Sequence, residues 1–219
     1  MQIAAQQPYF LPDFYCFSKI FRSDIFLIAD HLRFRKQSPI VRTRLDNGKY
    51  LTVPVSHQGL PAQPALRKVQ LISDNHWKIV HLRTISSLYQ KLPYFEHYFP
   101  ELEEIYNRKH QYLSLFLNDL IHWHVVHLGL QDKIHLASRM SISSQAELRK
   151  WFNNQKDPVW LVHPEEMEYY RREFLKSRLI EIIPADTQYF PEKYHPHFPL
   201  FMLFFLYGPE ARIILAKLS

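Results

Sequence analysis

Residues 3–30, IAAQQPYFLPDFYCFSKIFRSDIFLIAD, decide the fold of this chain. Ile3–Gln6 is a short apolar run that predicts a strand, and the two prolines in the loop after it disfavour helix. Asp13 can then cap a helix, because phenylalanine and isoleucine recur at helical spacing over residues 14–21. Residues 25–29 form a second continuous apolar run. Strand, helix and strand in this order indicate a parallel unit that is buried on both faces of a sheet.

Further along the chain, strands and helices continue to alternate. Asn47-Gly48 is a two-residue turn signal that predicts an antiparallel hairpin. Hydrophobic periodicity predicts helices over about residues 74–92, 95–107, 111–128, 144–154 and 164–177. Apolar runs predict strands at residues 67–72, 133–138, 159–163 and 179–186. The predicted fold is α/β, with a mostly parallel, Rossmann-like sheet, helices on both faces, an inserted antiparallel hairpin and a helical middle segment.

Composition is that of an ordinary globular protein. A length of 219 residues suffices for one sizeable core, so residues 1–219 are expected to form a single domain. Only four glycines occur, and no glycine-rich phosphate-binding motif is among them. The formal net charge of +6 suits an anionic ligand, but no run of five lysines or arginines exists. We therefore expect a small-molecule substrate and not a nucleic acid.

Cysteine and histidine usage gives no sign of a disulfide or a metal site. Cys16 is the single cysteine, which is typical of a reducing cytosol. The N-terminus lacks the features of a signal peptide, and the most apolar run, residues 198–208, is too short for a transmembrane segment. A cytoplasmic location is expected. Three histidines share the predicted helix 111–128 without zinc-binding spacing, so no metal is expected.

Ligands of open α/β sheets bind beyond the carboxyl ends of the strands. That rule places the loop 6–13, the segment after Asp30 and the segment after Asp186 at one edge. Asp30 is a candidate base or ligand-orienting carboxylate, and a strand-end cap is the alternative. The amides of the loop need partners that a polar ligand or neighbouring backbone can supply. Its aromatic residues can stack on a sugar or base ring, or pack in the core.

The segment after Asp30 is unusually rich in lysine and arginine. Five of them fall within 12 residues: Arg33, Arg35, Lys36, Arg42 and Arg44. Alternate residues of a strand share a face, so Arg42 and Arg44 are expected to point the same way. Such a cluster can hold a carboxylate or phosphate by bidentate contacts, and Arg42 is the strongest candidate. A solvated basic surface is the alternative.

The segments QQPYFLPDFYCFSKI, SDIFLIAD, RFRKQSPIVRTRL and LTVPV together resemble the N-terminal signature of the WbqC-like family. Later segments follow the order of that family over nearly the whole chain. The genes of these bacterial proteins often lie among those for surface polysaccharide and O-antigen assembly. The resemblance implies a transferase of lipopolysaccharide biosynthesis that moves an acyl or glycyl-type aminoacyl group onto a sugar intermediate.

Two functional hypotheses follow from this resemblance. In an active transferase, Asp30 is catalytic, and the substrate, a sugar nucleotide or acyl donor, is bound by Gln6, Gln7, Tyr9, Phe10, Lys36, Arg42 and Tyr194. Gln6, Met202 and Leu206, however, replace polar residues of the family pattern. The alternative is therefore a non-catalytic ligand-binding or assembly protein. The sequence names neither the donor, the acceptor nor a cofactor, and it does not specify the oligomeric state.

Overall fold

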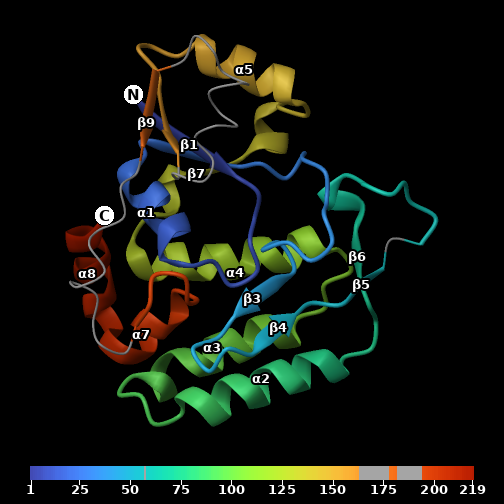
Figure 1. Cartoon of the computed structure of the whole chain (residues 1–219), viewed down its shortest axis with the longest axis vertical. Coiled ribbons are helices and arrows are strands. Elements are labelled where there is room, and N and C mark those ends of the chain that lie inside the picture. The colour runs from blue at the N-terminus through green and yellow to red at the C-terminus, as the bar shows by residue number, and fades with distance from the viewer. Residues whose placement is uncertain (57, 163–177, 182–193) are drawn as a thin grey trace.

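The computed structural model describes residues 1–56, 58–162, 178–181 and 194–219, and its largest sheet is parallel (Figure 1). In these residues the sheet has five strands in the order β7-β2-β1-β8-β9, and each neighbouring pair is parallel. The strands are β1 (Gln2–Gln6), β2 (Ile25–Ile28), β7 (Ile134–Leu136), β8 (Val159–Val162) and β9 (Arg178–Glu181). The predicted α/β fold with a mostly parallel sheet is confirmed.

Apolar side chains cover both faces of this sheet, because successive residues of a strand point to opposite sides. Ile3 and Trp160 belong to one core cluster, whereas Ala4 belongs to the other. Helix α5 (Gln145–Asn153) packs on the first face, and α1 (Phe14–Arg22) packs on the second (Figure 1). Helices therefore lie on both faces, as the sequence predicts.

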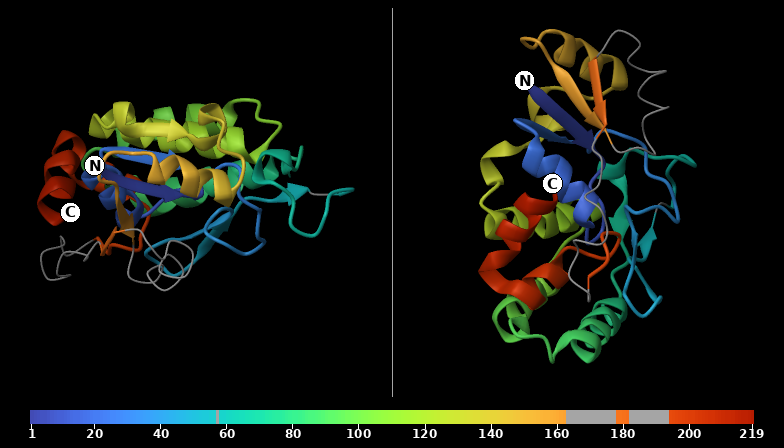
Figure 2. Two further views of the ribbon diagram at one scale, coloured as in Figure 1. Left: turned by 90° about the horizontal axis from the view of Figure 1, so that it is seen from above. Right: turned by 60° about the vertical axis from the view of Figure 1, so that its left-hand side comes forward.

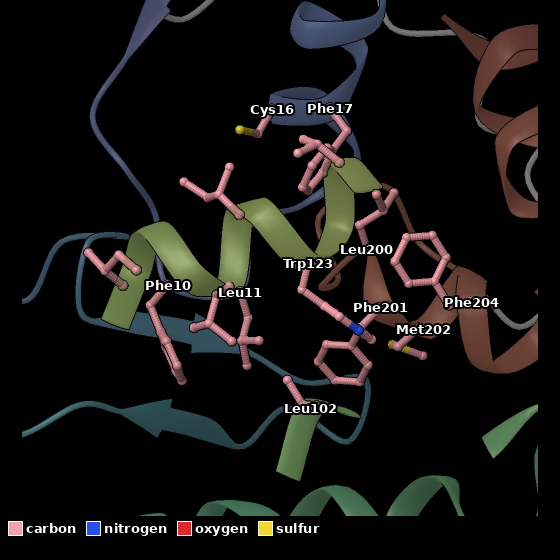
Figure 3. Packing of buried hydrophobic residues seen from close by; sticks show 14 of the residues in the cluster. Phe10, Leu11, Cys16, Phe17, Leu102, Trp123, Leu200, Phe201, Met202 and Phe204 are labelled. Carbon is pink, nitrogen blue, oxygen red and sulfur yellow. The ribbon is translucent and has the colours of Figure 1, made fainter. Parts of the chain in front are cut away.

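The predicted helical middle segment is also present. It consists of α2 (His76–Tyr89), α3 (Phe95–Asn107) and α4 (Leu113–Leu128), and the C-terminal helices are α7 (Phe201–Tyr207) and α8 (Ala211–Leu218). The right-hand view of Figure 2 shows α5 at one end of the molecule and the helices α2 and α3 at the other. Gly129 ends α4, as predicted, with a left-handed φ of 63°. In α7, Phe201 and Phe204 are buried, and Phe204 packs 5.4 Å from Trp123 (Figure 3). Residues 198–208 thus contribute to the core.

Two small antiparallel pieces extend from the body. The predicted hairpin at Asn47-Gly48 joins β3 (Arg42–Arg44) to β4 (Tyr50–Thr52). The second piece pairs β5 (Val55–Ser56) with β6 (Gln70–Leu71). Short 3-10 helices are η1 (Leu66–Lys68), η2 (Gln131–Lys133), η3 (Ala137–Met140) and η6 (Gly208–Glu210).

The prediction of one strand over residues 67–72 is wrong. Its first part belongs to η1, and only β6, two residues long, is extended. Leu66 and Val69 are both fully buried while the two residues between them are exposed. A spacing of three suits a turn of 3-10 helix, not the alternation of a strand. The predicted helix 164–177 lies outside the described residues, as does Asp186.

The strand order reverses beside β1. From β1 the chain adds β2 and β7 on one side, and later β8 and β9 on the other side. In open α/β sheets, this kind of reversal leaves a crevice at the carboxyl ends of the two strands that flank it. Here those strands are β1 and β8. Gln6 ends β1, so the loop that follows it begins at this position.

Candidate functional site

The loop of residues 7–13 lies against the cationic segment 33–43. Three hydrogen bonds connect them: Gln7 Nε2 to the Arg33 carbonyl (3.0 Å), the Phe10 N–H to the Pro39 carbonyl (2.9 Å), and Thr43 Oγ1 to the Leu11 carbonyl (3.4 Å). The two regions that the sequence singles out are therefore in contact. Both follow the carboxyl ends of adjacent strands, β1 and β2.

The loop is also held from its other side by the segment 194–200. The Leu200 N–H donates to the Pro12 carbonyl at 2.9 Å, and the Phe14 N–H donates to the Pro196 carbonyl at 3.1 Å. Leu11, immediately before these contacts, has a φ of 47°. That left-handed conformation costs about 1–3 kcal/mol for a residue with a branched side chain, so the surrounding bonds must fix it.

Two predicted ligand-binding aromatics lie in the interior. Phe10 is 1% exposed (Figure 3). Its ring lies 6.2 Å from that of Phe116 and 5.6 Å from that of His81. Tyr194 is buried too, and its hydroxyl donates to the Phe198 carbonyl. Burial, with a smaller effect of the Asp13 charge, raises the pKa of Tyr194. Tyr9 is half-buried and packs against the main core.

A buried cation lies beneath the carboxyl end of β1. Lys19 of α1 is 2% exposed, and its Nζ donates to Gln6 Oε1 at 2.8 Å. The sequence analysis did not select Lys19. The available signal was a lone lysine among the apolar residues of this helix. Gln6, a predicted ligand-binding residue, thus has an intramolecular partner.

Asp30, which follows β2, is held by η3. Its Oδ1 accepts the Ser138 N–H at 3.0 Å, and its Oδ2 accepts the Ser138 hydroxyl. Asp30 is 7% exposed. These contacts join residues 108 positions apart and give Asp30 a structural role in addition to any chemical one.

Ser138→Ala should lower the free energy of unfolding by about 1.5–3 kcal/mol, the range for a hydrogen bond to a charged group. Urea denaturation at pH 7 measures this effect. Ser143→Ala is a matched control, because the Ser143 hydroxyl also donates to a carboxylate, that of Glu147, but at an exposed site. Loss of the Ser143 hydroxyl should lower the free energy of unfolding by under about 1 kcal/mol. Equal effects of the two substitutions would contradict the role assigned to Ser138.

His31 is a residue that sequence reasoning missed. Neither ring nitrogen is solvent-accessible, and neither has a hydrogen-bond partner among the described residues. Burial lowers the pKa of His31, against the opposing effect of the Asp30 and Glu147 carboxylates. A neutral imidazole therefore lies directly beside Asp30. Its position immediately after a strand-end aspartate was the signal that could have identified it.

The predicted cations occupy two different environments. Lys36 is exposed. Arg42 is half-buried, with its guanidinium carbon 3.6 Å from the centroid of the Tyr50 ring, a cation–π contact. Its Nε is buried and has no hydrogen-bond partner in the described part of the chain. Arg42 thus keeps one unused donor.

Comparison with protein families gives a match that covers most of the chain. The model of the WbqC-like protein family matches residues 7–204, from the start of the N-terminal loop into α7. The chain belongs to the WbqC-like family. No curated protein and no solved structure matches it. In this WbqC-like protein, the matched range includes every predicted catalytic or substrate-binding residue except Gln6.

Two cavities of the WbqC-like chain lie away from the N-terminal loop. One, of about 370 Å³, lies between α2 and α3, and the other, of about 440 Å³, lies between α3 and α4. In the second, His127 Nε2 is 2.7 Å from Glu101 Oε2, which also accepts the Trp123 N–H. Neither cavity is lined by residues 7–13 or 30–44.

The described residues show neither a metal cluster nor a membrane-spanning helix. Across residues 1–162 (except 57), 178–181 and 194–219, no three histidine, cysteine or acidic side chains converge to hold a metal ion. Over the same ranges, every helix is too short or too polar to cross a bilayer. His124, one of the three histidines on α4, is completely buried in the core.

Proposed function

We propose that this WbqC-like protein transfers an acyl or glycyl-type aminoacyl group onto a sugar intermediate of bacterial surface polysaccharide, such as O-antigen. The contact between the loop 7–13 and the segment 33–43, beside the reversal of strand order, is the main support. Membership of the WbqC-like family agrees with a role in polysaccharide biosynthesis. The substrate is a sugar nucleotide or an acyl donor, and both classes carry the anionic groups that a cationic segment attracts.

Arg42 is proposed to hold the anionic group of this substrate. Stacking on Tyr50 fixes the plane of its guanidinium, and the buried Nε has no partner in the described part of the chain. An unsatisfied buried donor costs free energy that an incoming acceptor can recover. Lys36, exposed on the same segment, adds charge, and Gln7 and Tyr9 are proposed to contact the neutral part of the substrate.

Asp30 is proposed to orient or deprotonate the acceptor amine or hydroxyl. A general base must come within hydrogen-bond reach of the proton that it removes. Each oxygen of the carboxylate accepts one hydrogen bond from Ser138 and keeps a second lone pair for the acceptor proton. The bonds from Ser138 hold the carboxylate in place while it acts.

Arg42→Met should weaken ligand binding, and a thermal-shift screen tests this with a sugar nucleotide, an acyl-CoA and glycine. Loss of a charged hydrogen bond costs about 1.5–3 kcal/mol, or roughly 10- to 100-fold in Kd. Arg83→Met is the matched control, since Arg83 is exposed on α2. If none of these compounds stabilises the native protein, or if both variants respond like it, the transferase assignment loses its support.

The alternative is a non-catalytic ligand-binding or assembly protein. Specific observations favour it: Gln6 is engaged by Lys19, Met202 is 2% exposed within the core, and the Asp30 carboxylate is bound to Ser138. Gln6→His combined with Leu206→Asn restores polar groups at two altered positions. Turnover gained by this variant, with a native circular dichroism spectrum, would indicate a decayed enzyme. Turnover by the unaltered protein would eliminate this alternative.

A further inference from the structure

The side-chain amide of Gln6, the last residue of β1, has one possible orientation. Its Oε1 accepts a hydrogen bond from Lys19 Nζ at 2.8 Å. Both residues are buried, since Gln6 is 7% exposed and Lys19 is 2% exposed. A lysine ammonium has three donors and no acceptor, so the oxygen of the amide must face it and not the nitrogen. The Nε2 group of Gln6 is therefore turned away from Lys19.

The amide nitrogen of Gln6 has no hydrogen-bond partner. Neither of its N–H groups donates a hydrogen bond in the part of the chain that the structure describes. Over the same ranges, the completely buried atoms that lack a partner do not include Gln6 Nε2, so this nitrogen keeps some contact with solvent. An unpaired donor on a residue this deeply buried costs free energy that an acceptor can recover. Gln6 thus offers two N–H groups to a ligand.

The backbone holds this amide at the edge of the sheet where ligands of open α/β proteins bind. The Gln6 carbonyl accepts the Ala29 N–H at 2.8 Å, which joins the carboxyl ends of β1 and β2. Alternation along β1 directs Gln6 to the same face as Ala4, the face on which α1 places Lys19. The strand also flanks the reversal of strand order. Gln6 is thus in place before any ligand arrives.

Lys19 also determines which kind of ligand group suits Gln6. A hydrogen bond to the oxygen of an amide polarises the amide and strengthens its N–H groups as donors. The positive charge of the buried ammonium acts in addition on the acceptor that these N–H groups bind, because water screens it only weakly. Both effects favour an acceptor with negative charge, and both disfavour a cation or a second donor.

We propose that Lys19 is a positioning residue that makes Gln6 a hydrogen-bond donor, and that Gln6 binds a negatively charged oxygen of the substrate. The second part rests on the proposed function, because it places the ligand of that function at the carboxyl end of β1. Carboxylate and phosphate oxygens share this chemistry. Glycine carries the first group, whereas sugar nucleotides and acyl-CoA carry the second. The inference requires binding of the substrate and does not require its turnover.

Nuclear magnetic resonance of the ¹⁵N-labelled full chain follows the Gln6 side-chain amide directly. The substitution Gln6→Glu removes one pair of side-chain N–H resonances, which assigns this pair in the native spectrum. Glycine, UDP-glucose and acetyl-CoA are then titrated separately at constant pH and ionic strength. We expect saturable shifts of the Gln6 pair with at least one of these probes. A response to glycine identifies a carboxylate, and a response to the other two identifies a phosphate.

Gln6→Glu separates the donor role of Gln6 from its contact with Lys19. Glutamate keeps an oxygen for Lys19 but replaces the N–H groups with a negatively charged oxygen, so the Kd of the bound probe should rise at least tenfold. In urea, this variant should unfold at a higher concentration than Gln6→Met, which removes the acceptor for Lys19 as well. Gln90→Glu is the matched control, because Gln90 is exposed at the end of α2 and should not affect binding.

Lys19→Met tests the positioning role. Without the ammonium, the Gln6 amide can turn its oxygen toward the ligand, so binding of the probe should weaken at least tenfold. The shift of the Gln6 pair on titration should be lost too, which a purely structural role of Lys19 would not cause in a folded variant. Should Lys19→Met not fold, the comparison of Gln6→Glu with the native protein decides.

Three results would overturn this inference. The first is native affinity in Gln6→Glu, and the second is an equal effect of Gln6→Glu and Gln90→Glu. The third is an absence of shifts of the Gln6 pair with all three probes. Binding that depends on Arg42 but not on Gln6 would reject the donor role of Gln6 while the proposed function stands.

Discussion

Lowering the pH from 6.5 to 4 should decrease the free energy of unfolding. The substitution His124→Phe should make this decrease smaller by about 3 kcal/mol. His124 is fully buried and stacks on Phe17 at 5.0 Å. Burial, with a smaller contribution from the charge of His127, lowers the pKa of His124 to about 3. The unfolded chain takes up a proton on this histidine near pH 6.5, whereas the native chain excludes it until about pH 3.

The direction of this effect follows from proton linkage. Because the pKa is lower in the native state, the contribution is fully present above pH 6.5 and is lost as the pH falls. Each excluded proton lowers stability by about 1.4 kcal/mol per pH unit. His81, whose pKa burial lowers to about 4, adds a second such slope. Both side chains belong to the packed interior.

Urea denaturation between pH 7.5 and pH 4 measures the slope. Phenylalanine suits position 124 because the Nδ1 of His124 donates only to Leu120 of its own helix. His124 Nε2 has no hydrogen-bond partner among the described residues. His122→Phe on the exposed side of α4 should keep the native slope. The same pH dependence in the native protein and in His124→Phe would contradict a neutral His124.

Phe10→Ala should lower the free energy of unfolding by about 3–5 kcal/mol, the usual cost of emptying a buried aromatic site. Phe10 is 1% exposed and lies between Phe116 and His81, so its removal leaves a cavity that these rings cannot fill. Phe10→Leu should cost much less and should retain any ligand response. Equilibrium unfolding in urea, followed by near-ultraviolet circular dichroism, measures the loss.

Tyr9→Ala separates the core from the site. Tyr9 is only half-buried, so its truncation should cost less stability than that of Phe10 while weakening ligand binding more than Phe10→Leu does. A Phe10→Ala variant as stable as the native protein would contradict the assignment of Phe10 to the core.

Local signals in the sequence predicted much of the fold. Asp13 caps α1 as expected, with its Oδ1 accepting the Cys16 N–H, and Asn47-Gly48 makes the turn between β3 and β4. These features depend on neighbouring residues. The position of β8 beside β1 was not predictable in this way, because Gln2 pairs with Val159 across most of the chain. Val80, an apolar residue of α2, is 45% exposed because the packed face of this helix follows His81 and Ile85.

The location of the candidate site was predictable from the sequence, whereas most of its side-chain contacts were not. The rule for carboxyl ends of strands brought the loop 7–13 and the cationic segment together, and their hydrogen bonds agree with it. Side-chain partners were missed when they come from distant segments, as with Ser138 for Asp30. The burial of Phe10 and Tyr194 likewise depends on helices far along the chain.

The hydrogen bonds between the N-terminal loop and the segment 194–200 have a consequence for folding during translation. The backbone of Pro12 and Phe14 is hydrogen-bonded to Leu200 and Pro196, residues that are synthesised much later than the loop. Contacts this distant in sequence slow folding, and the chain emerges over roughly ten seconds or more. The N-terminal loop must therefore wait for the segment 194–200 before it acquires its final conformation. A nascent chain that stalls before residue 194 would expose the aromatic residues of the loop as an unpaired hydrophobic surface that chaperones bind.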